Sequence, residues 1–243
     1  MPRILVVESN PRSICDRIFA EAGSDFGTLY ADLLVSLRGD VTTTITLPYE
    51  GETVSDMALF DGVAFTGSSV EWNTGDDRAS PLAEVMRRAF ASGCPVIGSC
   101  NGMQLAASVL GGVTSASAKG REDGLAHGIR LTEQGRTHPM MTGKPQTFDA
   151  PCTHRDEVER LPEGAVRLAG NAHSEVQAFA FERDGISFWG TQYHPEFPPG
   201  FLARYLASSG KGSPVGLAGL ASSESSAEAV MRTSEIRNWV ERL

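Results

Sequence analysis

Short apolar runs alternate, along the first half of the chain, with longer segments in which apolar residues recur every three or four positions. The short runs predict buried strands, and the periodic segments predict amphipathic helices. In segment 24–37, Leu29, Leu33 and Leu37 fall on one helical face, and Ser24 is placed to cap the helix. The strands expected in this half cover residues 3–8, 41–47, 62–66 and 95–99, and the helices cover 24–37 and 81–91.

Beyond residue 112 the pattern changes to short, strand-like pieces. Strands that alternate with helices favour a parallel sheet covered on both faces, and consecutive short strands favour antiparallel pairing. We therefore expect an α/β fold of three layers, flavodoxin-like, whose mostly parallel sheet has helices on both faces and carries an antiparallel addition. The strands expected in that addition cover residues 128–132, 146–150, 165–169, 176–182 and 186–191.

The last part of the chain differs in composition from the rest. Residues 207–226 are rich in serine and glycine, which is typical of a linker. Residues 224–243 carry apolar side chains on one side of an expected amphipathic helix. We therefore expect one domain over residues 1–206, followed by a linker and a C-terminal helix over residues 207–243.

The net charge of the chain is −9, and its isoelectric point is near 5.1. An acidic surface disfavours nucleic acid or an anionic membrane as the main partner. Only four apolar residues precede Glu8, too few for the core of a secretion signal, and no apolar stretch approaches the ~20 residues that span a bilayer. The four cysteines show neither metal-binding spacing nor a dense disulfide pattern, so we expect a cytoplasmic protein without a metal site.

A cysteine stands at an expected strand-to-helix turn. The segment 98–102, Gly-Ser-Cys-Asn-Gly, follows an apolar run and precedes a helical one, which places Cys100 at the tip of the turn. A helix N-terminus favours the thiolate, the reactive form of cysteine, through its dipole and its free N–H groups. Glycines on both sides of Cys100 suit a turn where strand and helix approach closely. These features predict a nucleophilic cysteine.

A histidine and a glutamate follow another expected strand, over residues 186–193. Alternation along an extended segment places the side chains of His194 and Glu196 on the same side of the backbone. Glu196 can then accept a hydrogen bond from the imidazole and orient it. With Cys100, the chain holds a nucleophile, a base and an orienting carboxylate, which favours a cysteine-dependent acyl-transfer enzyme.

Three segments together resemble the class I glutamine amidotransferase family. Segments 98–104 (GSCNGMQ) and 190–196 (GTQYHPE) resemble its two signature motifs, and segment 61–68 (DGVAFTGS) resembles its oxyanion-loop strand. The order and spacing of the segments agree with the family over about residues 1–206. The resemblance implies hydrolysis of a γ-glutamyl amide through a thioester, without a metal or an organic cofactor.

The resemblance also implies roles for the residues at the matching positions. Cys100 is implied as the nucleophile, His194 as the general acid and base, and Glu196 as the group that orients His194. The backbone N–H groups of Ser68 and Asn101 are implied as the oxyanion hole, whose donors stabilise the developing negative charge.

Five residues are expected to contact the substrate: Gly67, Gln104, His154, Asp156 and Trp72. Gln104 matches a family position near the glutamyl group, and His154 and Asp156 match a segment that frames the pocket. A solvated turn is the alternative for His154 and Asp156, and an exposed loop aromatic is the alternative for Trp72. The residues expected to be structural are His127, His138, His173, Cys15, Cys94 and Cys152.

Two versions of the activity fit these motifs. In the first, the chain works alone on a γ-glutamyl conjugate of a small amine or peptide and releases glutamate. In the second, it supplies ammonia from glutamine to a separate synthase. The lack of a fused synthase domain, an oxyanion loop that reads Gly-Ser-Ser where the family commonly has Gly-Gly-Pro, and the C-terminal extension favour the first version. A synthase partner or a homo-oligomer stays open.

Two other classes of protein are disfavoured. Related cysteine-elbow chaperones and stress hydrolases typically lack the His-Pro-Glu segment that this chain has at residues 194–196. A non-catalytic binding module would have no need for the complete set of Cys100, His194 and Glu196.

Overall fold

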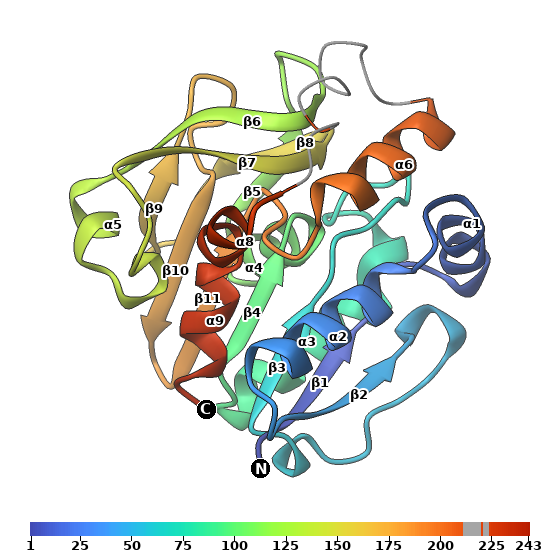
Figure 1. The fold of residues 1–243 in the computed structure, drawn as a ribbon. Helices are drawn as coiled ribbons and strands as arrows, with labels where there is room; N and C mark the ends of the chain where they lie inside the picture. Colours follow the sequence, from blue (N-terminus) through green and yellow to red (C-terminus); the bar gives the residue numbers. More distant parts are fainter. Residues whose placement is uncertain (211–219, 221–223) are drawn as a thin grey trace.

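The fold is built around one mixed β-sheet (Figure 1). The computed structural model describes residues 1–210, 220 and 224–243 of the 243-residue chain. The strands of the sheet are β1 Arg3–Val7, β2 Thr42–Thr46, β3 Gly62–Phe65, β4 Val96–Ser99, β6 Glu122–Leu131, β7 Thr147–His154, β9 Val166–Gly170, β10 Ala178–Arg183 and β11 Ile186–Thr191. Within the described residues their order is β2-β1-β3-β4-β11-β10-β9-β6-β7.

Strand β11 joins a parallel half of the sheet to an antiparallel half. Strands β2, β1, β3, β4 and β11 run parallel, whereas β11, β10, β9, β6 and β7 pair antiparallel. In the pairing of β4 with β11, Gly98 lies opposite Gly190 and Ser99 lies opposite Thr191. The carboxyl ends of these two strands are therefore neighbours, at the edge of a parallel sheet where ligand sites form.

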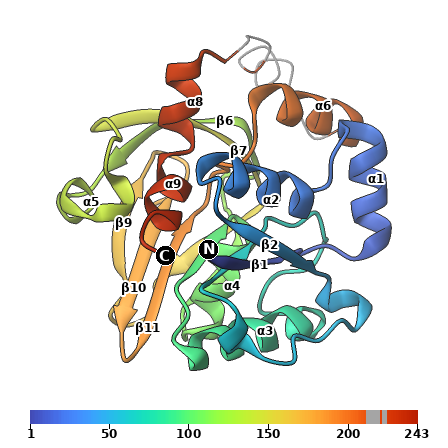
Figure 2. The same cartoon turned by 60° about the horizontal axis from the view of Figure 1, so that its bottom comes forward.

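Helices cover both faces of the sheet (Figures 1 and 2). They are α1 Arg12–Ala22, α2 Phe26–Leu37, α3 Ser80–Ser92, α4 Asn101–Val109, α5 Glu133–Thr137, α6 Pro199–Ser209, α8 Ser226–Arg232 and α9 Ser234–Val240. In β1, Ile4 and Val6 belong to the apolar cluster shared with α2 and α9, and Leu5 and Val7 belong to the cluster shared with α3 and α4. This alternation confirms the three-layer α/β fold with its antiparallel addition.

Several short elements lie outside the predicted set. A small second sheet pairs β5 (Val113–Ala116) with β8 (Asp156–Arg160), and short 3₁₀ helices cover Pro48–Glu50, Met57–Leu59, Asp77–Ala79 and Pro139–Met141. Strands β6 and β7 are longer than predicted, and their pairing brings Glu122 opposite His154. None of the helices in the described ranges has the length and apolar character needed to cross a bilayer.

The cap and the buried face of α2 differ from the prediction. The N-cap is Asp25, not Ser24, because the Asp25 carboxylate accepts the backbone N–H of Thr28 at 2.7 Å. The fully buried face includes Tyr30 and Leu34, whereas the three leucines predicted to form it are only partly buried. The helix itself was predicted to within two residues.

The chain after residue 197 contains more helix than expected. Helix α6 has no predicted counterpart and continues to Ser209, past the expected start of the linker. Most of that linker, residues 211–219 and 221–223, lies outside the described residues. The single helix expected over 224–243 is instead two helices, α8 and α9, which meet at Thr233. The division at residue 206 stays a prediction.

Candidate active site

Cys100 lies in the sharp turn between β4 and α4. Its backbone has φ 50° and ψ −104°, a region that a residue with a side chain rarely adopts. A Cβ atom on Gly98 would lie 2.6 Å from the carbonyl carbon of Gly102, and one on Gly102 would lie 2.7 Å from the carbonyl oxygen of Phe65. Both glycines of the motif are therefore required by the close approach of strand and helix.

The Cys100 side chain is 5% exposed and lies at the N-terminus of α4. Its backbone N–H donates to the carbonyl oxygen of Thr191 at 2.7 Å, which ties the turn to the end of β11. Asn101 is the first residue of α4, so its N–H has no acceptor in a preceding helical turn. The N-terminal dipole and this N–H favour negative charge beside Cys100.

His194 lies just beyond the end of β11, next to Cys100. Its Nδ1 is 2.7 Å from Oε1 of Glu196, its ring stacks on Phe197 with centroids 4.0 Å apart, and its N–H donates to the Pro151 carbonyl at 2.7 Å. Burial disfavours a charged imidazole, but the Glu196 carboxylate and the nearby Cys100 raise the pKa of His194 to about 10. Nε2 has no hydrogen-bond partner among the described residues, and the Cys100 thiol donates to the Thr153 carbonyl oxygen at 3.8 Å, so Nε2 is available to the thiol.

The loop after β3 contacts His194 directly. A Cβ atom on Gly67 would lie 2.5 Å from Cε1 of His194, so only glycine leaves room for the ring. The Ser68 hydroxyl donates to the Ser9 carbonyl at 2.7 Å, and the Ser69 N–H donates to the Asn10 side-chain oxygen at 2.6 Å. The loop is therefore fixed by the segment that follows β1.

Glu8 and Asn10 form a support for this loop that sequence reasoning missed. Oε1 of Glu8 accepts the side-chain amide of Asn10 at 2.7 Å, and Oε2 accepts the N–H of Gly27 at 2.5 Å. Burial raises the pKa of Glu8 to about 7, although these hydrogen bonds oppose the shift. The signal was available, because polar residues directly after a buried parallel strand lie at the edge where sites form.

A pocket of about 340 Å³ opens over Cys100. Of the predicted residues, Ser68, Trp72, Cys100, Asn101, Gln104, His154 and Asp156 line it. Arginine side chains that the sequence did not single out also line it: Arg17, Arg121 and Arg155. The expected nucleophile, the residues of the expected oxyanion hole and four of the five expected substrate contacts thus line one pocket. Gly67 is not among the lining residues and lies against the histidine ring, so its expected contact with the substrate stays a prediction.

The polar side chains of the pocket wall hold one another in place. Nε2 of Gln104 donates to the Asp156 carbonyl at 2.6 Å and to the Gln192 side chain at 3.1 Å. The Asp156 carboxylate accepts two hydrogen bonds from Arg155, at 2.7 and 2.9 Å. His154 and Asp156 are 3% and 8% exposed, so the alternative of a solvated turn is wrong for both.

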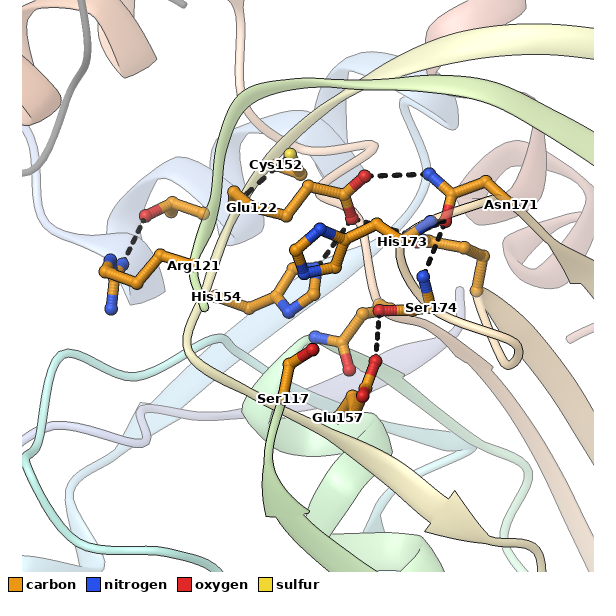
Figure 3. Close-up of polar contacts among 12 residues, drawn as sticks. Ser117, Arg121, Glu122, Cys152, His154, Glu157, Asn171, His173 and Ser174 are labelled. Atoms are coloured by element: carbon orange, nitrogen blue, oxygen red, sulfur yellow. Dashed lines mark hydrogen bonds and ion pairs between the residues drawn. The ribbon is translucent and has the colours of Figure 1, made fainter. Parts of the chain in front are cut away.

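His154 belongs to a buried network centred on Glu122 (Figure 3). Nε2 of His154 is 2.9 Å from Oε2 of Glu122, which also accepts the side-chain amide of Gln177 at 2.8 Å. Asn171 donates to the other carboxylate oxygen at 2.7 Å. Burial opposes the charge on Glu122, but these donors lower its pKa below the usual value. Sequence reasoning missed Glu122, whose partners are distant along the chain.

Trp72 is half-buried at the rim of the pocket. Its indole N–H donates to the Tyr49 hydroxyl at 3.2 Å, and the Arg78 guanidinium lies 4.8 Å from the ring centroid. The ring is thus held at the pocket entrance rather than free in solvent.

The other histidines and cysteines lie outside the pocket lining. His127 is exposed and pairs with Asp149 at 2.7 Å, and His138 caps a 3₁₀ helix. All four cysteines are unpaired and buried. Within residues 1–210, 220 and 224–243, no group of three or more His, Cys, Asp or Glu side chains is placed to hold a metal ion.

The family is established by sequence. Residues 35–208, well over half of the chain, match the family described as "Glutamine amidotransferase class-I", and this range contains Cys100, His194 and Glu196. The chain therefore belongs to the class I glutamine amidotransferase family, as its motifs indicated.

Two named relatives illustrate the range of that family. The gamma-glutamyl-L-1-hydroxyisopropylamide hydrolase of a Pseudomonas species is 32% identical over 214 residues, which cover 86% of this chain and 72% of that protein. The glutamine-hydrolyzing GMP synthase of Thermomicrobium roseum is 29% identical over 197 residues, which cover 81% of this chain and 35% of the synthase. The chain thus spans about a third of the length of the synthase.

Solved structures share the fold. A glutamine amidotransferase from Thermotoga maritima superposes with a TM-score of 0.75 at 18% identity, covering 99% of this chain and 97% of that one. A glutamine amidotransferase from Methylobacillus flagellatus gives a TM-score of 0.65 at 18% identity, covering 99% and 92%.

Proposed function

We propose that the chain hydrolyses a γ-glutamyl amide to glutamate and an amine, without a partner synthase. The observation that carries the proposal is the His194 imidazole, bonded to Glu196 through Nδ1 and left free at Nε2 to serve Cys100. The Pseudomonas relative, named for the hydrolysis of a γ-glutamyl amide, supports this substrate class.

The first half of the reaction forms a thioester. With the pKa of His194 at about 10, the imidazolium persists at neutral pH and stabilises the Cys100 thiolate. The thiolate attacks the γ-carbonyl carbon, and negative charge develops on the carbonyl oxygen. His194 then gives its proton to the departing nitrogen as the C–N bond breaks, and the amine leaves.

The second half consumes a water molecule. His194 accepts a proton from the water, which attacks the thioester carbonyl, and the C–S bond breaks to release glutamate and Cys100. In both halves the backbone N–H groups of Ser68 and Asn101 stabilise the oxyanion. One such donor is worth ~10²–10³-fold in rate, so the loop after β3 is as important as the base.

The pocket wall holds the glutamyl group. The Gln104 amide nitrogen donates to the Asp156 carbonyl and to Gln192, so the remaining side-chain oxygens of Gln104 and Asp156 are acceptors suited to the α-amino group. The arginines of the pocket lining, Arg121 and Arg155, are donors suited to the α-carboxylate. His154 keeps that wall in place, and Trp72 lies on the leaving-group side. A pocket of about 340 Å³ falls within the ~300–1,000 Å³ of small-molecule sites, which accommodates a conjugate of glutamate.

The second candidate is a glutaminase that supplies ammonia to a separate synthase. The similarity to the GMP synthase of Thermomicrobium roseum over about a third of its length favours it. A synthase partner would then be required, and the free substrate would be glutamine. For either activity we place the chain in the cytoplasm, whose reducing conditions keep a thiol usable.

A substrate panel separates the two candidates. The purified chain alone is incubated with glutamine and with γ-glutamyl amides of larger amines, and glutamate release is measured, with Cys100→Ala as the blank. We expect larger conjugates to be cleaved with a higher kcat/KM than glutamine. Comparable or faster action on glutamine alone would favour the ammonia donor, and turnover by Cys100→Ala would remove the nucleophile assignment.

A further inference from the structure

The segment that carries His194 and Glu196 is bound by side chains of the two C-terminal helices, α8 and α9, which Figure 1 shows in red. Arg232, the last residue of α8, donates through Nη1 to the carbonyl oxygen of Pro195, which lies between the two candidate catalytic residues. Arg232 is 8% exposed, and Glu224 fixes its guanidinium with two hydrogen bonds at 2.7 and 3.0 Å. The Arg232 guanidinium is therefore buried, and Glu224 and the Pro195 carbonyl together fix its orientation.

A second contact holds the residue on the other side of His194. The Tyr193 hydroxyl donates to the carboxylate of Glu235 in α9. Glu235 also pairs with Lys144 at 3.1 Å, and the side chains of this pair are 0% and 1% exposed. Burial, together with Glu235, raises the pKa of Tyr193, so the hydroxyl keeps its proton and remains a donor.

One of these contacts is made to the backbone of Pro195 and the other to the side chain of Tyr193, and neither is made to the substrate. Tyr193 and Pro195 flank His194 directly, so their two bonds define where the imidazole lies relative to Cys100. A displacement of about 1 Å in a reacting group can cost ~10²-fold in rate, whereas substrate binding elsewhere in the pocket is unaffected. Breaking a contact of this kind therefore affects kcat more than KM.

We propose that α8 and α9 position His194 and Glu196 against Cys100, with Arg232 as the principal positioning residue and Tyr193–Glu235 as the second tether. The proposal rests on the roles of Cys100, His194 and Glu196 in the proposed function. It gives the C-terminal extension a part in the reaction, although neither Arg232 nor Glu235 lines the pocket over Cys100.

The test compares Arg232→Met with Arg232→Lys and with Arg242→Met. Arg242 is a matched control at the C-terminal end of the chain, because its guanidinium lies 4.3 Å from the Trp189 ring centroid and 3.5 Å from Glu182, away from the catalytic segment. Two quantities are measured on folded protein: kcat and KM for a γ-glutamyl amide, and the pH dependence of iodoacetamide alkylation at Cys100, resolved by peptide mass spectrometry. The alkylation needs no substrate, so it reports on the position of His194 even if the proposed substrate class is wrong.

We expect Arg232→Met to lower kcat ~tenfold or more with KM changed less than ~twofold. Cys100 should be alkylated more slowly at neutral pH, because the imidazolium no longer faces the sulfur. Arg232→Lys should recover part of both effects, and Arg242→Met should match the parent chain. Arg121, whose charge also acts on Cys100, is unchanged in all variants.

A folded Arg232→Met protein with the parent kcat and alkylation profile would overturn the proposal. If that variant does not fold, Tyr193→Phe decides, since it removes only the hydroxyl and leaves Lys144 paired with Glu235. A ~threefold or greater fall in kcat with slower alkylation of Cys100 at neutral pH supports positioning, and unchanged values contradict it. If the variants change the alkylation of Cys100 but the parent chain does not hydrolyse γ-glutamyl amides, the positioning proposal stands and the proposed function is rejected.

Discussion

The two halves of the site, the turn around Cys100 and the segment 194–196, are held by different means. The turn is fixed by close backbone contacts: Gly98 allows β4 and α4 to approach each other, and Gly102 allows α4 to approach Phe65 in β3. The histidine segment instead depends on partners 37 and 42 residues away along the chain, Arg232 and Glu235. A nucleophile can thus be positioned by close contacts between backbone segments, while its base is positioned by side chains that are distant in the sequence.

The largest effect is expected from a substitution in the turn around Cys100. In Gly98→Ala the new methyl group meets backbone atoms at 2.6 Å, which no side-chain movement can relieve. We expect a loss of about 3 kcal/mol or more in the free energy of unfolding, measured by urea denaturation, and no activity. Gly39→Ala is the control, because nothing lies within 4 Å of its Cβ position. Equal stability of the two variants would contradict the steric account of the turn.

The next effect concerns the charge that holds the base. Glu196→Gln removes the anion that raises the pKa of His194 from 6.5 to about 10, so the folded-state pKa falls. We expect kcat/KM to drop ~10²-fold, and its alkaline limb to move to lower pH, because the imidazolium now loses its proton earlier. Glu182→Gln, which removes a carboxylate beside His138 at 3.6 Å, should leave the pH profile unchanged. An alkaline limb that stays in place would show that Glu196 does not set the protonation of His194.

A third change acts where the two halves meet. Gly67→Ala places a methyl group 2.5 Å from Cε1 of His194, so the ring must leave its stacked position on Phe197. Stability should therefore fall by about 1–3 kcal/mol while kcat falls ~10-fold to 10²-fold. Gly200→Ala, with its nearest atom at 3.7 Å, is the control for stability and for steady-state rates. Unchanged kcat would mean that the ring position is not critical.

The smallest effect is expected at the support of the oxyanion loop. Asn10→Ala removes the acceptor of the Ser69 N–H but leaves the Ser68 hydroxyl bonded to the Ser9 carbonyl. We expect a ~threefold to tenfold loss of kcat, less than the loss of a whole oxyanion donor. Asn238→Ala, which removes an amide bonded to the Met140 and Thr142 carbonyls, is the matched control. Equal kcat values for both variants would show that Asn10 does not support the oxyanion loop.

The same contrast explains what the sequence could predict. Strand β4, the turn at Cys100 and strand β11 follow from apolar runs and local glycines, so their positions along the chain were predictable. The parallel pairing of β11 with β4 was not, since residues 186–191 were expected only in the antiparallel addition. The pairing of Glu122 with His154 and of Arg232 with Pro195 requires the folded topology, because no local pattern links residues 32 and 37 positions apart. The break between α8 and α9 was missed because the apolar spacing continues across it.

Helices α1 and α6 were missed for a related reason. Helix α1 follows Pro11 without a side-chain cap, and α6, which begins at Pro199, also has no side-chain cap and contains Gly200, so neither shows a capping side chain at its start. Their apolar residues, among them Ile18, Phe201 and Leu206, find each other only in the folded chain, where they form a separate cluster. Periodicity without caps was too weak a signal to identify them.

The central claim, that Cys100 carries the glutamyl group, is tested most directly by trapping the covalent intermediate. The chain is mixed with a γ-glutamyl amide, quenched in acid during the first turnover, digested and analysed by mass spectrometry. The account predicts a glutamyl group on the peptide that contains Cys100, formed at least as fast as glutamate is released, and neither product in Cys100→Ala. Glutamate release by Cys100→Ala, or turnover of the parent chain with the glutamyl group on another residue, would contradict it.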